Sequence, residues 1–512
     1  MAIKRYFADS DNTITDALLE GLSNRATGSN SGQADVLEVF SIYGQSGSTE
    51  KDYSSEVSRV LLKFPVSQIS KDRENNIIEE SGSVSFYLKL YNARHANTLP
   101  RNYRMTIDAV SSEWEEGNGL DLDKYTDLTY DKIGSNWIRR KGPTAWSIPG
   151  GDYYNDPSSS FECAFPIGNE DLEIDITTLA EQWINSSGNE PVLGSKDNYG
   201  VMIKLSASYE ASSSTNLEGA NTSYYTKMFY GRGSEFFFNR PVLEARWDSS
   251  KRDNRANFYI SSSLVPAEDN LNTLYMYNYI RGTLKDIGGL STHEPVLRLY
   301  HSSGSNPEGT AKGFLNSSNS PVYFLSSSRE SKGVYKVKFA VTSSIVSSTY
   351  PYLIDVWSLH EDQIHTGSAI DPKTFTMSNY NPNGKYVVSI PNLKTSYRRG
   401  QTERFRFYVR EKNWSPNIYT KAKSTPEGLM INSASYEIYR VVDNKIVIPY
   451  NTGSDSGTIM SYDEQGNYFD LDINMLEEGY SYGIRVSFYE DSLTSFREHP
   501  NIFKFRVGQN EY

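Results

Sequence analysis

Hydrophobic and polar residues alternate in short segments along most of the chain. The clearest runs have these hydrophobic members: Val84, Phe86, Leu88 and Leu90; Tyr335, Val337, Phe339 and Val341; and Phe405, Phe407 and Val409. A period of two places one set of side chains on one face of a β-strand, whereas a helix would scatter them around its axis. Gly, Ser, Asn and Asp separate the runs, which is typical of turns between strands. The pattern therefore predicts an all-β protein built of antiparallel sandwiches.

Residues 178–184 are the clearest exception to this pattern. Leu179 and Trp183 are four residues apart, and Thr178 and Glu181 have the spacing of a capping box. We expect a short helix that buries Trp183, although a platform for stacking a sugar is the alternative role of that ring. A weaker helical pattern in residues 14–22 is equally compatible with an extended edge segment.

Two polar stretches predict the domain boundaries. Residues 248–255 are dense in charge, and residues 377–385 are rich in turn formers. We therefore predict three domains, at residues 1–248, 249–378 and 379–512. Each of the last two has about seven strand-like runs in roughly 120 residues, which matches an immunoglobulin-like sandwich by length and strand number. The usual cysteine pair of such domains is absent, because Cys163 is the only cysteine.

Composition and charge disfavour nucleic acids and membranes as partners of this protein. Of 512 residues, 38 are Tyr, and aromatic residues reach 13%, which favours pleated strands. Asp and Glu number 63 against 51 Lys and Arg, so the net charge of −12 repels phosphate backbones, and we expect no nucleic-acid partner. We also expect no membrane insertion, because no apolar run approaches the roughly 18 residues of a membrane helix. The lone cysteine and the absence of an apolar leader favour folding in a reducing cytoplasm, with lysis or dedicated secretion as routes out.

Residues 1–248 contain five short motifs in a fixed order. They are Leu61-Leu62-Lys63-Phe64, Trp114-Glu115-Glu116-Gly117, the segment from Asp175 to Trp183, Asn198-Tyr199-Gly200, and Arg240-Pro241-Val242-Leu243. In this order they resemble the DNRLRE-type β-sandwich, a jelly-roll module with the shape of a carbohydrate-binding module. The resemblance covers nearly half of the chain and implies a jelly-roll-like first domain. It transfers no functional residue, because the shared motifs belong to the scaffold.

The whole chain also resembles long structural proteins of tailed bacteriophages, especially marine and cyanobacterial myoviruses. The similar stretches are residues 4–15, 224–248 and 408–417. The resemblance implies a structural, non-enzymatic virion component of the neck, collar, tail or a fibre, assembled in the host cytoplasm. Its expected partners are other virion proteins and further copies of itself around a symmetry axis. The alternative is a receptor-binding adhesin that recognises host surface glycans.

Motifs for catalysis are missing from the sequence. Nucleophile elbows, phosphate-binding loops, the zinc motif H-E-x-x-H and the dinucleotide motif G-x-G-x-x-G do not occur, so we expect no catalytic residue and no cofactor. The near miss Gly231-Arg232-Gly233 has the composition of a turn. Glu113, Glu115 and Glu116 flank Trp114, as in a glycosidase subsite, but a turn that buries the Trp and solvates the acids explains them equally. A depolymerase would need two such carboxylates facing one groove.

Two groups of residues suggest metal ligands. Asp9-Ser10-Asp11-Asn12 and the pair Asp121 and Asp123 offer oxygen ligands that suit calcium, yet they lack EF-hand spacing and equally suit capped turns. His360 and His365 are close in sequence, but a spacing of five across a strand and turn points them apart. We expect no metal site.

Three tyrosines are the best candidates for a binding surface. Tyr275, Tyr277 and Tyr279 alternate with Leu274 and Met276, so they line one face of a predicted strand. Tyrosine gives a large contact area at low entropic cost, and we predict an exposed strand that contacts another protein. Two alternatives remain open, since this face could form the core or pack on the neighbouring domain.

Overall fold

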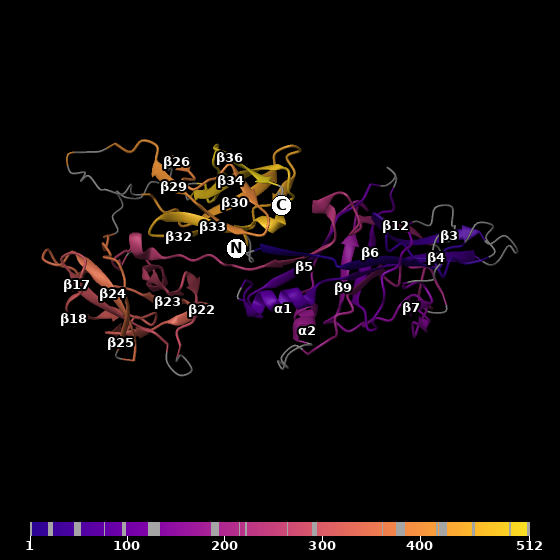
Figure 1. The fold of residues 1–512 in the computed structure, drawn as a ribbon, viewed down its shortest axis with the longest axis horizontal. Helices are drawn as coiled ribbons and strands as arrows, with labels where there is room; N and C mark the ends of the chain where they lie inside the picture. Colours follow the sequence, from indigo (N-terminus) through magenta and orange to yellow (C-terminus); the bar gives the residue numbers. More distant parts are fainter. Residues whose placement is uncertain are drawn as a thin grey trace. The chain divides into compact units, whose positions relative to one another are not determined.

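The computed structural model confirms the all-β, multi-domain sandwich fold (Figure 1). It describes residues 3–18, 24–45, 53–75, 77–94, 99–120, 134–185, 194–213, 216–220, 223–263, 265–288, 294–360, 362–374, 385–415, 418, 428–452, 456–490 and 493–508. The chain divides into two compact units, Ile3–Trp247 and Asp248–Tyr512. The predicted second boundary, in residues 377–385, falls almost entirely outside the described residues, and the division into three domains stays a prediction. In the described part of the chain, no helix is long and apolar enough to cross a membrane.

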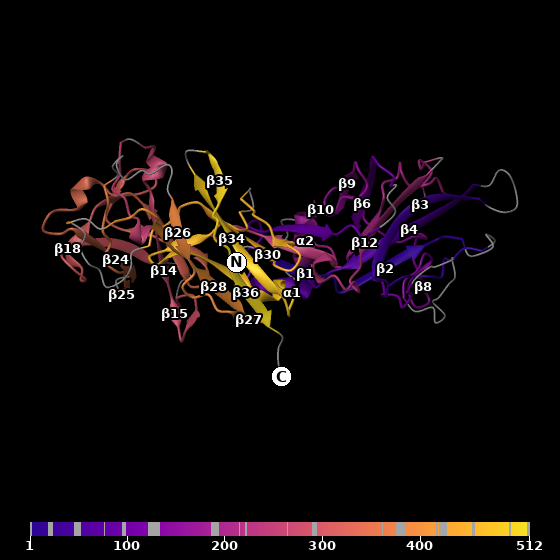
Figure 2. The ribbon, with the colours of Figure 1, turned by 90° about the horizontal axis from the view of Figure 1, so that it is seen from above.

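The first unit pairs a four-stranded sheet with a seven-stranded one. The smaller sheet has the order β1 (Ile3–Phe7), β13 (Val242–Arg246), β5 (Ser85–Leu90) and β10 (Leu172–Asp175). The larger sheet has the order β12 (Tyr224–Tyr230), β3 (Val36–Gln45), β4 (Tyr53–Lys63), β11 (Val201–Leu205), β6 (Tyr103–Ala109) and β9 (Ser160–Phe165), with β2 (Ser10–Thr15) also on β4. A hairpin, β7 (Arg139–Lys141) and β8 (Thr144–Ala145), and a 3₁₀ turn at Phe237–Asn239 complete the unit. The pairings within both sheets are antiparallel, and Figure 2 shows the long strands β3 and β4 near β2.

The alternation seen in the sequence determines the core of this unit. Phe86, Leu88 and Leu90 of β5 are fully buried, as the sequence predicts. They share one cluster with Val60 and Leu62 of β4, which belong to the facing sheet. The two sheets therefore face each other across an apolar layer, the arrangement of a sandwich.

Two short helices cover part of this core. They are α1 (Val66–Glu74) and α2 (Thr177–Asn185), which lie beside each other in Figure 1 and contact each other. The predicted helix at residues 178–184 is confirmed, and Trp183 is 1% exposed in the core. Glu181 differs from its predicted role in a capping box, because its carboxylate accepts two hydrogen bonds, of 2.6 and 2.7 Å, from the Arg73 guanidinium of α1. In the weaker helical segment, residues 14 and 15 lie in strand β2, and residues 19–22 are outside the described part.

The other face of the larger sheet is also covered. Trp114, Trp137 and Trp146, from the segment between β6 and β9, pack with Leu61 of β4 and Met202 of β11 in a second cluster. This segment lies over β4 and β11, so these central strands are apolar on both sides.

The second unit contains two sandwiches. The sheets of the first are β14 (Asn272–Tyr277), β23 (Val334–Phe339) and β22 (Ser328–Ser331), and β18 (Glu308–Lys312), β17 (Val296–Ser302), β24 (Tyr352–Leu359) and β25 (Asp362–Thr366), with β21 (Leu325–Ser326) on β17. Small hairpins pair β15 (Tyr279–Ile280) with β16 (Thr283–Leu284) and β19 (Phe314–Leu315) with β20 (Pro321–Val322). Short 3₁₀ turns lie at Asn254–Ala256, Ala267–Asn270 and Ser343–Ile345. Leu274 of β14 and Trp357 of β24 belong to one core cluster, which joins the two sheets.

The other sandwich of this unit has an aromatic interior. Its sheets are β27 (Ser396–Arg398), β36 (Phe503–Gly508), β34 (Ser481–Glu490), β30 (Ala434–Arg440) and β31 (Ile446–Ile448), with β35 (Ser495–Glu498) on β34, and β28 (Thr402–Arg406), β33 (Gly466–Asp472) and β32 (Ser461–Asp463). Strands β26 (Tyr386–Ser389) and β29 (Tyr408–Glu411) form a separate pair, and a 3₁₀ turn lies at Ile473–Met475. The rings of Tyr436 and Phe469 stack across the two sheets with centroids 3.8 Å apart.

Replacing Trp183 tests whether this ring belongs to the core or to a binding surface. We expect Trp183→Ala to lower the free energy of unfolding of the first unit by about 3–5 kcal/mol, because a buried ring is replaced by a cavity. Tyr224→Ala, at a ring that is 60% exposed, is the control and should change it by less than about 0.5 kcal/mol. Urea unfolding of the full chain, followed by circular dichroism, measures both values. Equal effects of the two substitutions would contradict the core assignment.

Candidate functional site

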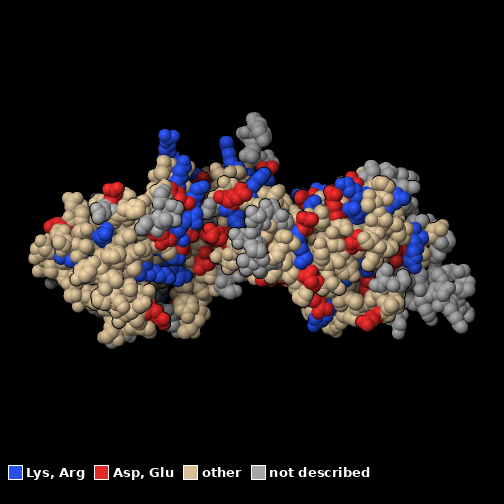
Figure 3. Space-filling view, turned by 90° about the horizontal axis from the view of Figure 1, so that it is seen from below, with Lys and Arg blue, Asp and Glu red and all other residues tan. Residues whose placement is uncertain are grey.

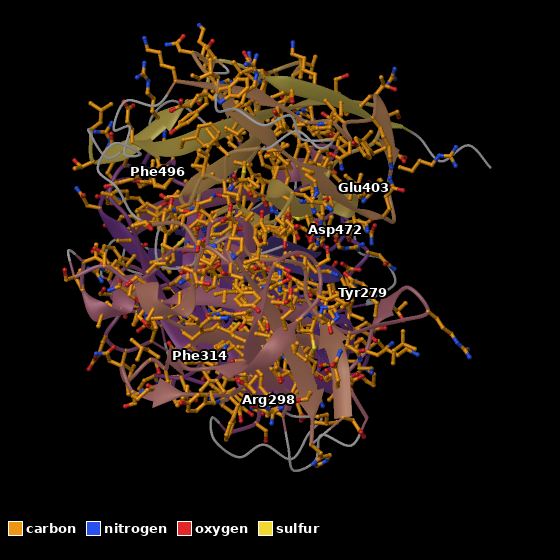
Figure 4. All side chains as sticks on the ribbon, turned by 90° about the vertical axis from the view of Figure 1, so that its left-hand side faces the viewer. Tyr279, Arg298, Phe314, Glu403, Asp472 and Phe496 are labelled. Carbon is orange, nitrogen blue, oxygen red and sulfur yellow. The ribbon has the colours of Figure 1, made fainter. Side chains whose placement is uncertain are left out.

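The three candidate tyrosines form a row of rings, but they differ in exposure. Tyr275 is 6% exposed, Tyr277 is half-buried and Tyr279 is 60% exposed. Neighbouring rings stack with centroids 6.2 and 6.4 Å apart. The prediction that the whole strand is exposed is therefore wrong for Tyr275. Tyr279 lies in the β15–β16 hairpin, which Figure 2 shows projecting from its sandwich and Figure 4 labels at Tyr279.

The start of the second unit covers the inner part of this row. The backbone of residues 251–253 pairs with β32, since Tyr462 N donates to Lys251 O at 3.0 Å and Asp253 N donates to Tyr462 O at 3.1 Å. On the other side, Thr273 N of β14 donates to Asn254 Oδ1 at 2.9 Å. Residues 251–254 therefore form a strap that links the two sandwiches of the second unit.

Electrostatic contacts place the last sandwich next to the tyrosine row. Burial, and then the nearby Tyr468 and Asp253, raise the pKa of Tyr277 above its usual range. Tyr468 belongs to β33 of the last sandwich, so Tyr277 lies near that sandwich. This position favours packing on a neighbour, one of the two alternatives left open by the sequence. Burial, opposed by charge and hydrogen bonds around Arg404 and Ser461, raises the pKa of Tyr468 itself to about 12.

A buried ion pair anchors the end of the strap. Arg255 donates to both oxygens of Asp355, at 2.5 and 2.8 Å, and Trp357 Nε1 donates to Asp355 Oδ2 at 2.7 Å. Burial alone would raise the pKa of Asp355, but hydrogen bonds and charge from Arg255 outweigh burial and hold that pKa below its usual range. Gly367 leaves the necessary room, because a Cβ there would lie 2.0 Å from Asp355 Oδ1.

In the first unit, residues from three separate sequence motifs meet in one cluster. Asp11 of the calcium candidate donates its backbone N–H to Glu116 Oε1 at 2.9 Å. Arg232, from the turn at residues 231–233, donates to both oxygens of Glu116 at 2.8 and 2.9 Å and, through its backbone N–H, to Asp11 Oδ2 at 2.5 Å. Spacing in the sequence gave no sign of this, because Asp11 and Arg232 are 221 residues apart.

In the cluster of Asp11, Glu116 and Arg232, the positive charge of Arg232 neutralises the negative charge of Glu116. Burial raises the pKa of Asp11 to about 7, with the hydrogen bond from the Arg232 backbone opposing this shift and the Glu116 charge adding to it. Both oxygens of Glu116 are engaged by the guanidinium, which an attacking carboxylate or general base would need free. The cluster pins two loops onto β2.

The remaining acidic candidates do not converge on a second site. Glu113 is exposed and pairs with Lys141 at 3.2 Å, while Trp114 is 7% exposed and donates to Tyr199 O at 2.7 Å, as expected of a turn that buries the ring. Asp121 and Asp123 lie outside the described residues. Among the residues that the structure describes, no group of three or more His, Cys, Asp or Glu side chains is placed to hold a metal ion.

The histidine pair is divided by a turn. His360 has a φ of 56° at the turn between β24 and β25, and His365 lies opposite Trp357 in β25. Burial lowers the pKa of His365, with the charges of Asp355 and Arg255 acting in opposite directions on it.

Comparisons with known proteins give no assignment. No family model matches the chain, and no curated protein does. A chimeric titin Z1Z2 tandem functionalised with a GRGDS peptide from fibronectin shares 9% identity over 47% of this chain and 91% of its own, with a TM-score of 0.15. A trypsin-activated alpha-2-macroglobulin from Escherichia coli shares 8% over 91% of this chain and 23% of its own, with a TM-score of 0.15. A DUF4785 family protein from Legionella pneumophila shares 10% over 92% of this chain and 90% of its own, with a TM-score of 0.12. Likeness at this level supports no inference about function.

Replacing Asp11 tests the electrostatics of the first cluster. An unfolded Asp has a pKa of about 3.9, whereas the pKa of folded Asp11 is about 7. Between about pH 4 and pH 7 the Asp11 carboxyl is therefore protonated in the folded chain and ionised in the unfolded chain. Stability of the first unit should therefore fall as pH rises through this interval, and Asp11→Asn should flatten the decline. The midpoint of urea unfolding, determined at several pH values between about 4 and 7, measures this decline in both proteins. Asp156→Asn is the control, because hydrogen bonds from Ser158 and Ser159 lower the pKa of Asp156, so this carboxyl titrates below the interval and the decline should persist in that variant. A decline unchanged in Asp11→Asn would contradict the assignment.

Replacing Tyr277 tests the contact between the sandwiches of the second unit. We expect Tyr277→Ala to accelerate amide hydrogen exchange in residues 461–470 about tenfold, which corresponds to ~1.4 kcal/mol of local stability. Tyr279→Ala removes an exposed ring of the same row and should leave exchange there unchanged. Exchange followed by mass spectrometry of peptides measures both. Equal exchange in the two variants would exclude this packing role.

Proposed function

We propose that the protein is a structural, non-enzymatic component of a tailed-bacteriophage virion, in the neck, collar, tail or a fibre. It acts through contacts with other virion proteins and with further copies of itself. The proposal starts from the resemblance to phage structural proteins. The observation that supports it best is the strap at residues 251–254, which binds the two sandwiches of the second unit together.

The strap suits a part that must keep its shape under load. Sandwiches joined by a free polar linker move relative to each other by default. Here the linking residues add backbone hydrogen bonds to β32 and contact β14, and Arg255 fixes their end in a buried ion pair. Tyr275 and Tyr277 are buried or half-buried near the same joint, so these rings help to hold the second unit rigid.

The surface charge is compatible with protein partners. On the face in Figure 3, groups of Lys and Arg lie next to groups of Asp and Glu. Mixed charges of this kind favour oriented contacts between proteins, because complementary patches steer and select partners. The net charge of −12 disfavours a role in packaging or binding DNA.

A receptor-binding adhesin for host glycans is the second candidate. Exposed rings in the first unit favour it, since Tyr224 is 60% and Phe236 is 49% exposed. Tyr224 already stacks on Tyr225, and Phe236 lies edge to face with Tyr230, so the rings form two separate pairs. A depolymerase is disfavoured, because Arg232 neutralises Glu116.

Immunogold labelling of purified particles tests the proposal directly. With antibody against the recombinant chain, we expect gold at the neck or along the tail, and serum absorbed with the same chain is the control. Label confined to fibre tips would favour the adhesin. Intact and opened particles that both stay unlabelled would overturn the virion assignment.

A further inference from the structure

Lys227 of β12 places its ammonium group inside the core of the first unit. The residue is 1% exposed, and its Nζ lies 5.0 and 5.2 Å from the ring centroids of Phe165 and Phe229. Lysine is almost never fully buried unless it is paired, because the ammonium loses its hydration. Among the described residues, the oxygens within hydrogen-bond distance of this Nζ are all neutral.

The three oxygens around Nζ have a particular arrangement. Two are main-chain carbonyls, of Glu170 at 2.7 Å and Gly168 at 3.1 Å, and the third is the side-chain amide oxygen of Asn92 at 2.6 Å. A neutral amine has two N–H bonds and one lone pair. As an ammonium, Nζ has three N–H bonds and donates one to each of these oxygens. Loss of the proton that faces Asn92 leaves the amine lone pair on the side of the Asn92 amide group.

The backbone holds this pair in register. Asn92 follows β5 and forms a bridge with Phe229 of β12. Hydrogen bonds flank the bridge on both sides, from Ala93 N to Met228 O and from Tyr230 N to Tyr91 O, each at 3.0 Å. Fixing an amine against an amide in this way replaces much of the entropic cost of a bimolecular reaction.

The surroundings also favour a nucleophilic amine. Burial lowers the pKa of Lys227 to about 8, against the opposing charges of Glu170 and Asp171, so a fraction of neutral amine exists near neutral pH. Asp171 Oδ1 accepts the backbone N–H of Asn92 at 2.7 Å, which helps to fix the position of Asn92.

We propose that Lys227 and Asn92 form an intramolecular isopeptide bond. The Nζ lone pair attacks Cγ of Asn92, the Nζ–Cγ bond forms, and the Cγ–Nδ2 bond breaks. The amide nitrogen leaves as ammonia and takes the proton that the amine gives up. The reaction consumes no oxidant, reductant or cofactor, and its products are one secondary amide and one ammonia.

The bond would cross-link the two sheets of the first sandwich. Asn92 continues β5 of the smaller sheet, and Lys227 belongs to β12, the edge strand of the larger one. A covalent link there prevents the sheets from separating even when the packing between them is lost. This inference is independent of the proposed function, because it concerns the first unit alone.

The mass of the intact chain tests the proposal. We expect the purified full-length protein to be lighter than its sequence by one ammonia, and digestion to release a branched peptide that joins the segments of Asn92 and Lys227. Incubation at a pH above the pKa of Lys227 should complete the reaction in any fraction that is unreacted. A chain that keeps its full sequence mass before and after this incubation overturns the proposal.

Matched variants test whether Lys227 and Asn92 are the two residues that form the bond. Lys227→Arg keeps the positive charge and Asn92→Ala removes the amide, and each should restore the full mass. Lys204→Arg is the control, because Lys204 is also buried and lies over a ring, that of Tyr153, but is paired with Asp108; its mass deficit should persist. A deficit that remains in Lys227→Arg would place the loss of ammonia elsewhere and overturn the assignment. The wild-type measurement stands even where a variant fails to fold.

Discussion

The central strands of the larger sheet in the first unit are apolar on both faces, and that unit depends on covering both. One face packs on the smaller sheet, and the other lies under the segment that contains Trp114, Trp137 and Trp146. This second cover is fixed by Arg59 of β4, which donates to both oxygens of Glu210 at 3.0 and 2.9 Å and to Gly150 O at 2.9 Å. The guanidinium also lies 5.1 Å from the ring of Trp137, so one buried cation ties the sheet, the loop and the aromatic layer together.

Buried charges recur at the places where separate segments must be held. Arg5 of β1 pairs with Glu244 of β13 at 2.6 Å; burial would raise the pKa of Glu244, but Arg5 holds it at about 2. Arg255 and Asp355 do the same at the end of the strap. Removing one partner of such a pair is costly, because the other charge remains buried without compensation. These pairs therefore fix register and loop position more than they add net stability.

Aromatic side chains have a similar structural role in the second unit. Tyr275 and Tyr277 lie on the face opposite their own core and pack toward the strap and the last sandwich, whereas Tyr279 remains exposed at the end of the row. The rings thus continue from a joint between sandwiches to the surface. A partner that approached Tyr279 would contact a side chain already stacked on this rigid joint.

The sequence by itself determined the all-β class and the short helix with Trp183, because the period of hydrophobic positions is a local property of a strand or helix. It also indicated which faces are apolar, as at Phe86 and Leu88. Only the tertiary structure decided what covers each face: Tyr277 lies near Tyr468 of a neighbouring sandwich, and the Glu181 carboxylate accepts hydrogen bonds from Arg73 of the other helix. The cluster of Asp11, Glu116 and Arg232 and the contact of Lys227 with Asn92 join residues more than 100 positions apart. Such contacts depend on strand order and register, and no spacing along the chain encodes them.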